Sequence, residues 1–177
     1  TLNKVVMLIY NKNISVSPLT THIPLKNVHK IISKNRIINH VKKIHNFYKK
    51  RFNKNPTFGI TSLNPHCETN SKIDEDFSII KPAINYLSRK KYKISGPYSA
   101  DTIFLKNNIK NFDVIIGMYH DQVLTPIKTI HEFDAINITL GLPFLRVSPD
   151  HGPNLSMFGK NKSNPLSLIR SIEFLNQ

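Results

Sequence analysis

The nine residues from Asp113 to Asp121, DVIIGMYHD, combine an apolar run with two side chains that can bind metal or move protons. The branched residues at positions 114–116 predict a buried strand. His120 and Asp121 then follow directly beyond its carboxyl end. Because ligands collect at this edge of open α/β sheets, the segment predicts both a central strand and a candidate site at its end.

Further strands and helices are expected to alternate around this segment. Apolar runs predict strands over Lys4–Tyr10, Thr57–Leu63, Tyr92–Ser95 and Ile136–Leu140. Periodic apolar positions predict helices over Pro24–Ile32, Asn35–Phe52, Asp74–Ser88 and Ala100–Asn107. Residues 15–24, Gly96-Pro97 and residues 141–143 are expected to form loops or turns. This alternation predicts an α/β fold with a sheet that is largely parallel at its centre.

The last expected helix has a clear start signal. Asn164 is suited to the N-cap and Pro165 to the first helical position. Leu166, Ile169 and Ile172 recur at helical spacing, so we expect them to be buried, together with Leu175. In the helix expected from Asp74, Pro82 requires a first-turn position or a kink.

The composition favours a cytoplasmic α/β chain. The 177 residues contain 40% hydrophobic residues, which suffices for the core of one domain or of parts of two. The single cysteine, Cys67, excludes an intrachain disulfide and favours a reducing compartment. The longest apolar run, Val5–Tyr10, is far shorter than the roughly 20 residues of a membrane span, and no segment resembles a secretory signal. We therefore expect no membrane partner.

The formal charge of +14 raises the question of nucleic-acid binding. The basic residues are spread along the chain, and Asn and Ile are as over-used as Lys, as a compositionally biased genome would produce. The densest basic cluster lies on one expected helix, at positions 42–51, where such charges usually form a solvated face. No stripe of alternating aromatic and basic residues is present, so we expect no nucleic-acid partner.

Three histidines occupy comparable positions. His66 and His120 each follow an expected strand, and His22 follows a polar loop. Neutral imidazole is a common ligand for zinc and related divalent ions. The three are 44 and 54 residues apart, so spacing alone does not show that they meet. Surface or hydrogen-bonded structural histidines therefore stay an open alternative.

Charged residues near these histidines are further candidates. Asp121 adjoins His120, and Asp101 opens an expected helix, where a capping role competes with a catalytic one. Lys128 and Arg146 can bind anionic groups, although solvated surface charge is the simpler reading of each. The chain contains neither the glycine-rich dinucleotide fingerprint nor a P-loop.

Six sequence blocks occur in the order and spacing of one family. They are residues 19–25 (LTTHIPL), 63–66 (LNPH), 96–102 (GPYSADT), 118–122 (MYHDQ), 137–144 (NITLGLPF) and 150–152 (DHG). The chain resembles, over nearly its whole length, the 4-hydroxythreonine-4-phosphate dehydrogenases of pyridoxal 5′-phosphate biosynthesis. In that family a long N-terminal portion precedes the matching region, so the resemblance implies that this chain covers roughly the C-terminal half.

The resemblance implies a fold like that of the isocitrate and isopropylmalate dehydrogenases, with two α/β domains around a cleft in a homodimer. Residues 1–130 would form a central α/β domain with the metal and dimer-interface residues. Residues 131–177 would form the C-terminal part of the first, cofactor-side domain. The active site would be shared between the two subunits.

The resemblance also assigns residues. His22, His66 and His120 match the metal ligands, drawn from both subunits, for zinc, magnesium or cobalt. Lys128, Asn137 and Arg146 match substrate-binding positions. Asp101, Asp121 and Lys128 are the candidates for proton transfer or for orienting a ligand.

The implied reaction is the oxidation of 4-phosphohydroxy-L-threonine by NAD or NADP. The product, 2-amino-3-oxo-4-phosphooxybutanoate, decarboxylates to 3-amino-2-oxopropyl phosphate. Two alternatives stay open: a sugar-acid phosphate such as erythronate or threonate 4-phosphate as substrate, and an inactive metal-binding fragment. Residues 67–70 and 152–161 depart from the family's glycine-rich patterns, which leaves the choice between NAD and NADP open.

Overall fold

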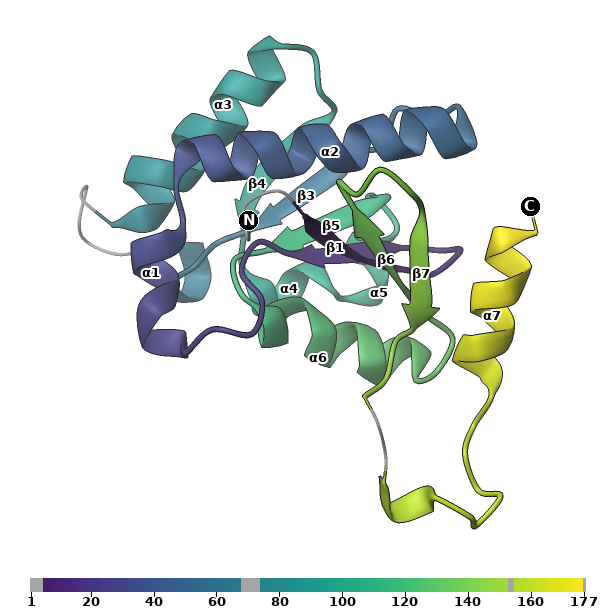
Figure 1. Cartoon of the computed structure of the whole chain (residues 1–177). Helices are drawn as coiled ribbons and strands as arrows, with labels where there is room; N and C mark the ends of the chain where they lie inside the picture. Colours follow the sequence, from purple (N-terminus) through teal and green to yellow (C-terminus); the bar gives the residue numbers. More distant parts are fainter. Residues whose placement is uncertain (1–4, 68–73, 153–154, 177) are drawn as a thin grey trace.

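Seven strands form one mixed sheet in this computed structural model, which describes residues 5–67, 74–152 and 155–176 (Figure 1). The strands are β1 (Val6–Tyr10), β2 (Ser15–Pro18), β3 (Phe58–Thr61), β4 (Ile94–Tyr98), β5 (Val114–Gly117), β6 (Ile136–Leu140) and β7 (Arg146–Pro149). Their order in the sheet is β4-β3-β5-β2-β1-β6-β7. The strands from β4 to β2 are parallel, whereas β2–β1, β1–β6 and β6–β7 pair antiparallel. The expected parallel centre is confirmed, and an antiparallel part adjoins it.

Helices cover both faces of the parallel strands. They are α1 (Val28–Ile31), α2 (Lys34–Phe52), α3 (Lys81–Arg89), α4 (Ala100–Ile103), α5 (Lys106–Ile109), α6 (His120–His131) and α7 (Leu166–Leu175). Figure 1 shows α2 and α3 on one face and α4, α5 and α6 on the other. Alternate side chains of β5 enter the two resulting cores: Ile116 packs on the α2 side and Ile115 on the α6 side. No helix of the described residues has the length and apolar character needed to cross a membrane.

The expected strands of the core are confirmed, but β2 falls where a loop was predicted. Its two serines made residues 15–24 resemble a loop. In the structure both serines are fully buried because their hydroxyls find partners. The Tyr48 hydroxyl donates to Ser15 Oγ at 2.8 Å, and Ser17 Oγ lies 2.7 Å from Nε2 of His40. Paired hydroxyls are compatible with a buried strand, and an alternation pattern cannot reveal the pairing.

Several helix boundaries differ from the expectation. The segment 24–32 forms a 3₁₀ turn, η1 (Leu25–Asn27), followed by α1, and residues 100–107 divide between α4 and α5. Pro82 occupies the first turn of α3, as expected, behind a π-helical turn, η3 (Asp76–Ile80). Gly96-Pro97 is not a turn: it lies inside β4, where the β3–β4 register is irregular.

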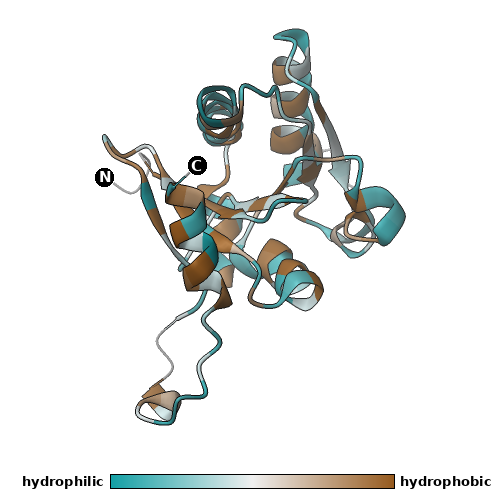
Figure 2. Cartoon of the chain, turned by 90° about the vertical axis from the view of Figure 1, so that its right-hand side faces the viewer, coloured by the Kyte–Doolittle hydropathy of each residue, from teal (hydrophilic) through white to brown (hydrophobic). Residues whose placement is uncertain are grey.

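The predicted buried face of α7 is wrong. Ile169, Ile172 and Leu175 are 45%, 53% and 51% exposed, whereas Ser167, Ser171 and Phe174 are buried. Figure 2, in which α7 faces the viewer, shows hydrophobic stretches along this helix.

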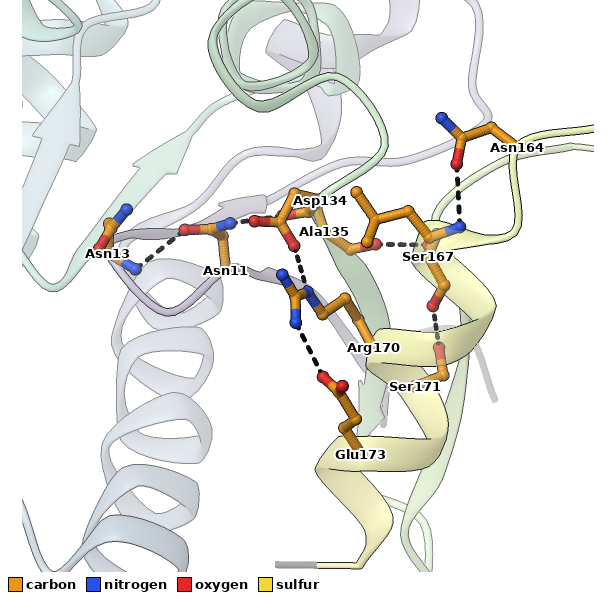
Figure 3. A network of polar contacts seen from close by, with 10 residues as sticks. Asn11, Asn13, Asp134, Ala135, Asn164, Ser167, Arg170, Ser171 and Glu173 are labelled. Atoms are coloured by element: carbon orange, nitrogen blue, oxygen red, sulfur yellow. Dashed lines mark hydrogen bonds and ion pairs between the residues drawn. The ribbon is translucent and has the colours of Figure 1, made fainter.

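Polar contacts determine the orientation of α7 (Figure 3). Ser167 Oγ donates to the carbonyl of Ala135, and Arg170 Nε donates to the carboxylate of Asp134 at 2.6 Å. These contacts turn the serine side of the helix toward the sheet. The apolar periodicity therefore marks an apolar face that the described residues leave exposed.

Candidate functional site

The loops that carry the three candidate histidines follow three neighbouring parallel strands. His22 follows β2, His66 follows β3 and His120 follows β5, and the sheet order is β3-β5-β2. Because parallel strands end at the same edge, these loops lie along one edge of the sheet although they are far apart in sequence. His22 and His66 are exposed, and His120 is partly buried.

Two of the histidines lie together. The ring centroids of His22 and His120 are 5.6 Å apart. His120 Nδ1 lies 2.7 Å from Oδ1 of Asp121, the arrangement in which a carboxylate accepts the Nδ1–H of an imidazole. That hydrogen bond favours the tautomer in which Nε2 carries a free lone pair, as a metal ligand requires.

His66 belongs to a separate group of residues. It lies in the 3₁₀ turn η2 (Pro65–Cys67) with a left-handed φ of 58°. The buried carboxylate of Asp76 supports this loop by accepting hydrogen bonds from the backbone N–H of Leu63 and of Asn64, at 2.7 and 3.1 Å. Burial raises the pKa of the adjacent Cys67, whose Sγ interacts with Ser62 and lies within the electrostatic reach of Asp76 and Asp101.

Asp101 is therefore a neighbour of the His66 loop rather than of His22. Its carboxylate accepts a hydrogen bond from Ser99 Oγ at 2.6 Å. Among the described residues, no three His, Cys, Asp or Glu side chains lie close enough to hold one metal ion. Within a single chain the structure thus places His22 and Asp121 each beside His120, and Asp101 within electrostatic reach of Cys67 in the His66 turn.

Two buried polar side chains that sequence reasoning did not single out join the three loops. Gln122 Oε1 accepts hydrogen bonds from Thr61 Oγ1 and from the backbone N–H of Met118, at 2.8 and 2.7 Å. Its Nε2 donates to the carbonyl of Ser62 at 2.7 Å. Thr20 Oγ1 donates to the carbonyl of Met118 at 2.7 Å. Gln122 is the last residue of the block MYHDQ, so its closeness to His120 in the sequence is the signal that could have identified it.

A cavity of about 480 Å³ adjoins His22. Its wall includes two of the three expected substrate-binding residues, Asn137 and Arg146. Asn137 Oδ1 is buried and has no hydrogen-bond partner among the described residues. Arg146 Nη1 donates to Thr139 Oγ1 at 2.9 Å, which directs the guanidinium along β6. The cavity wall thus contains a cation and an amide side chain near a candidate metal ligand, His22.

The third expected substrate-binding residue, Lys128, contacts Asp150. Lys128 Nζ lies 2.9 Å from Asp150 Oδ2 and also donates to the Asp150 carbonyl. Burial raises the pKa of the Asp150 carboxyl, and the nearby charges of Lys128, His120 and His151 oppose this rise. Lys128 and Asp150 therefore lie on the His120 side of the site. Asp150 opens the quoted block DHG, but no role was expected for it.

Comparisons with known proteins match this chain over nearly all of its length. Residues 1–175 match the family described as pyridoxal phosphate biosynthetic protein PdxA. The 4-hydroxythreonine-4-phosphate dehydrogenase of a Sulfurihydrogenibium species is 43% identical over 169 residues, which are 94% of this chain and 52% of that protein. That of Wigglesworthia glossinidia brevipalpis is 41% identical over 172 residues, which are 96% of this chain and 52% of that protein.

Solved structures agree in fold. The crystal structure of 4-hydroxythreonine-4-phosphate dehydrogenase from Klebsiella pneumoniae superposes with a TM-score of 0.82 at 30% identity, over 97% of this chain and 53% of that one. A terephthalate 1,2-cis-dihydrodiol dehydrogenase from Burkholderia xenovorans superposes with a TM-score of 0.74 at 20% identity and shows the fold alone. The chain spans about half the length of the curated relatives it matches.

Proposed function

Since the chain belongs to the PdxA family, we propose that the natural polypeptide containing these residues oxidises 4-phosphohydroxy-L-threonine with NAD or NADP and a divalent metal. Oxidation removes a hydride from C3 and the proton from its hydroxyl group. The resulting 2-amino-3-oxo-4-phosphooxybutanoate loses carbon dioxide to form 3-amino-2-oxopropyl phosphate. Relatives named for this activity, at 33–43% identity, support the proposal.

The observation that carries the proposal is the cavity beside the paired histidines. It combines Arg146, a guanidinium suited to a phosphate or carboxylate, with the unsatisfied Asn137 Oδ1. Because an amide oxygen left without a donor in a buried position is costly, we expect the Asn137 side chain to turn into the cavity when an ammonium or hydroxyl of the substrate offers it a donor. Both groups occur in a hydroxylated amino-acid phosphate.

The donor set fits a divalent metal. We assign His22 and His120 of one subunit as ligands, because their rings are neighbours and Asp121 leaves Nε2 of His120 free. The exposed His66 would come from a second copy of the chain, as the family resemblance implies. When bound, the ion would polarise the C3 hydroxyl group and stabilise negative charge on its oxygen.

The remaining residues would position the substrate and move its proton. Lys128 and Arg146 hold its anionic groups, so that C3 stays fixed during the reaction. Asp121 is the candidate acceptor of the hydroxyl proton within the same subunit, and Asp101 beside His66 would act across the dimer interface. NAD or NADP, when bound, would supply the acceptor for the hydride that leaves C3. Leu155 and Phe158 are 84% and 89% exposed, so this chain alone encloses no nucleotide there, and we assign no cofactor-binding residue.

An assay of the natural polypeptide tests the proposal. We expect NADH or NADPH formation from 4-phosphohydroxy-L-threonine, dependent on added divalent ion, and a smaller kcat/KM for erythronate 4-phosphate. A larger kcat/KM for erythronate 4-phosphate would instead identify a sugar-acid phosphate dehydrogenase. Absence of turnover with either substrate, in the presence of bound metal, would identify an inactive metal-binding protein.

A matched pair of arginine variants sharpens the assay. Arg146→Met should lower kcat/KM by about tenfold to hundredfold, because a charge-assisted contact to an anion is lost. Arg89→Met removes an exposed arginine at the end of α3 and should leave kcat/KM unchanged. Equal effects of the two substitutions would remove Arg146 from the substrate site.

A further inference from the structure

We propose that Asp150 is a positioning residue for Lys128, an inference that rests on the function proposed above. Its carboxylate and carbonyl hold the ammonium group of Lys128, so that this cation is in place before the anionic substrate arrives. Asp150 acts through Lys128 and does not itself contact substrate.

Two oxygens of Asp150 bind the ammonium group. Lys128 Nζ lies 2.9 Å from Oδ2 and also donates to the carbonyl oxygen of the same residue. An ammonium group has three donors, so two are used by Asp150 and one can face a ligand. The Lys128 side chain is 43% exposed, whereas that of Asp150 is only 9% exposed. The buried aspartate is therefore the fixed member of the pair.

The backbone at Asp150 is itself anchored. Its N–H donates to Ser167 Oγ at 2.8 Å, and this hydroxyl donates onward to the carbonyl of Ala135. Ser167 is 1% exposed, so the connection runs through the interior between α7 and the start of β6. Asp150 thus links Lys128, at the end of α6, to a buried hydrogen-bonded chain.

A lysine without such a partner would not be held in one place. Its four-carbon side chain has many rotamers, and fixing one of them when the ligand arrives costs entropy. The carboxylate of Asp150 also offsets part of the repulsion between Lys128 and the other cations of the site. Both effects favour substrate binding over the chemical step, which predicts a change in KM rather than in kcat.

Steady-state kinetics of the natural polypeptide test the inference. Asp150→Asn should raise KM for 4-phosphohydroxy-L-threonine about tenfold and change kcat less than about threefold. Asp150→Glu, which keeps the charge, should recover part of the loss. In a Lys128→Met background, Asp150→Asn should have no further effect, since the residue through which it acts is gone. If Asp150 had a purely structural role, Asp150→Asn would still change KM in the Lys128→Met background.

Asp113→Asn is the matched control. Asp113 forms a lysine ion pair with Lys54 at the amino end of β5, the opposite edge of the sheet, and its loss should leave KM unchanged. An unchanged KM in folded Asp150→Asn, or effects that add to those of Lys128→Met, would overturn the inference while wild-type turnover sustains the proposed function. A wild-type protein without turnover would overturn both.

Discussion

The three inner parallel strands, β2, β3 and β5, and the last two antiparallel strands, β6 and β7, are covered differently. Every residue of β2, β3 and β5 is buried, because helices pack on both faces. In β6 buried and half-buried residues alternate, and no residue of β7 is fully buried. Four apolar residues of α7 are about half exposed, namely Leu168, Ile169, Ile172 and Leu175, whereas Phe174 is buried.

The cavity lies where the two parts meet, because its wall includes Thr20 and His22 beyond β2 as well as Asn137 and Arg146. The histidine loops emerge from the covered parallel strands, whereas Asn137 and Arg146 belong to β6 and β7. The covered part provides a rigid support for the candidate metal ligands. The antiparallel part places the substrate-binding candidates on a face that the described residues leave open.

The largest expected effect is the difference in stability loss between an isoleucine-to-alanine substitution in β5 and one on α7. Ile116→Ala in β5 should lower the free energy of unfolding by about 2–5 kcal/mol, because the side chain is fully buried. Ile172→Ala on α7, at 53% exposure, should cost less than about 1 kcal/mol. Urea denaturation of both variants measures the difference. Equal losses would mean that α7 is as well covered as the parallel strands.

A second pair compares glycines in the two parts. A Cβ at Gly117, the end of β5, would lie 2.5 Å from Val123 Cγ1 and 3.2 Å from Gln122 Oε1. Gly117→Ala should therefore destabilise by about 1–3 kcal/mol. Gly152→Ala meets nothing within 4 Å and should be close to neutral. Thermal unfolding distinguishes them, and a neutral Gly117→Ala would show that the edge beside His120 is not tightly packed.

Acid should destabilise the contact between α2 and β2, the parallel strand that adjoins the antiparallel part. His40 of α2 contacts Ser17 of β2, next to β1, and burial lowers its pKa to about 3, with further lowering by the charges of Arg36 and Lys43. The folded state keeps this histidine neutral, while the unfolded chain takes up a proton below about pH 6.5. The contribution of His40 to the free energy of unfolding is therefore fully present above that pH. It decreases as the pH falls, by about 2 kcal/mol at pH 5.

His40→Gln tests this pH dependence. The variant should show a smaller loss of stability between pH 7.5 and pH 5, measured by urea denaturation at each pH. An identical loss in the variant and the parent chain would assign the effect to other groups.

The smallest expected effect concerns helix caps. Ser33 Oγ accepts the Arg36 N–H at the start of α2. The N-cap of α7 is Pro165 and not the expected Asn164, but Asn164 Oδ1 still accepts the Leu166 N–H. Ser33→Ala should lower the free energy of unfolding by about 1 kcal/mol. Asn164→Ala should chiefly accelerate amide hydrogen exchange within α7, since this helix has less apolar cover. Equal loss of global stability in both variants would contradict that contrast.

The comparison also explains how far the sequence predicts the fold. Runs such as Val114–Ile116 and the periodic residues of α2 predict their elements because the apolar pattern and the burial coincide. Such patterns fail for β2, because its buried serines are hydrogen-bonded to Tyr48 and His40, which are distant in sequence. They fail again for α7, because periodicity identifies an apolar face and not what covers it.

The candidate site shows the same limit. The block MYHDQ predicts that His120 lies at a strand end, and the sheet order that places His22 beside it follows from pairing between distant strands. Asp150 and Gln122 each lie in a quoted block, but their contacts are with residues farther away in sequence, Lys128 and Thr61, which no local pattern reveals. The roles of the eight expected site residues stay predictions.

Metal content after mixing two variants tests the central claim, a metal site shared between two copies of the chain. His22→Ala and His66→Ala should each lose bound divalent metal as separate homodimers, measured by elemental analysis. In a heterodimer of the two variants, one site lacks both His22 and His66, and the other site keeps all three histidines. We predict that the purified heterodimer recovers about one ion per dimer. Recovery of no metal in the heterodimer, or retention of metal by His66→Ala alone, would contradict the shared site.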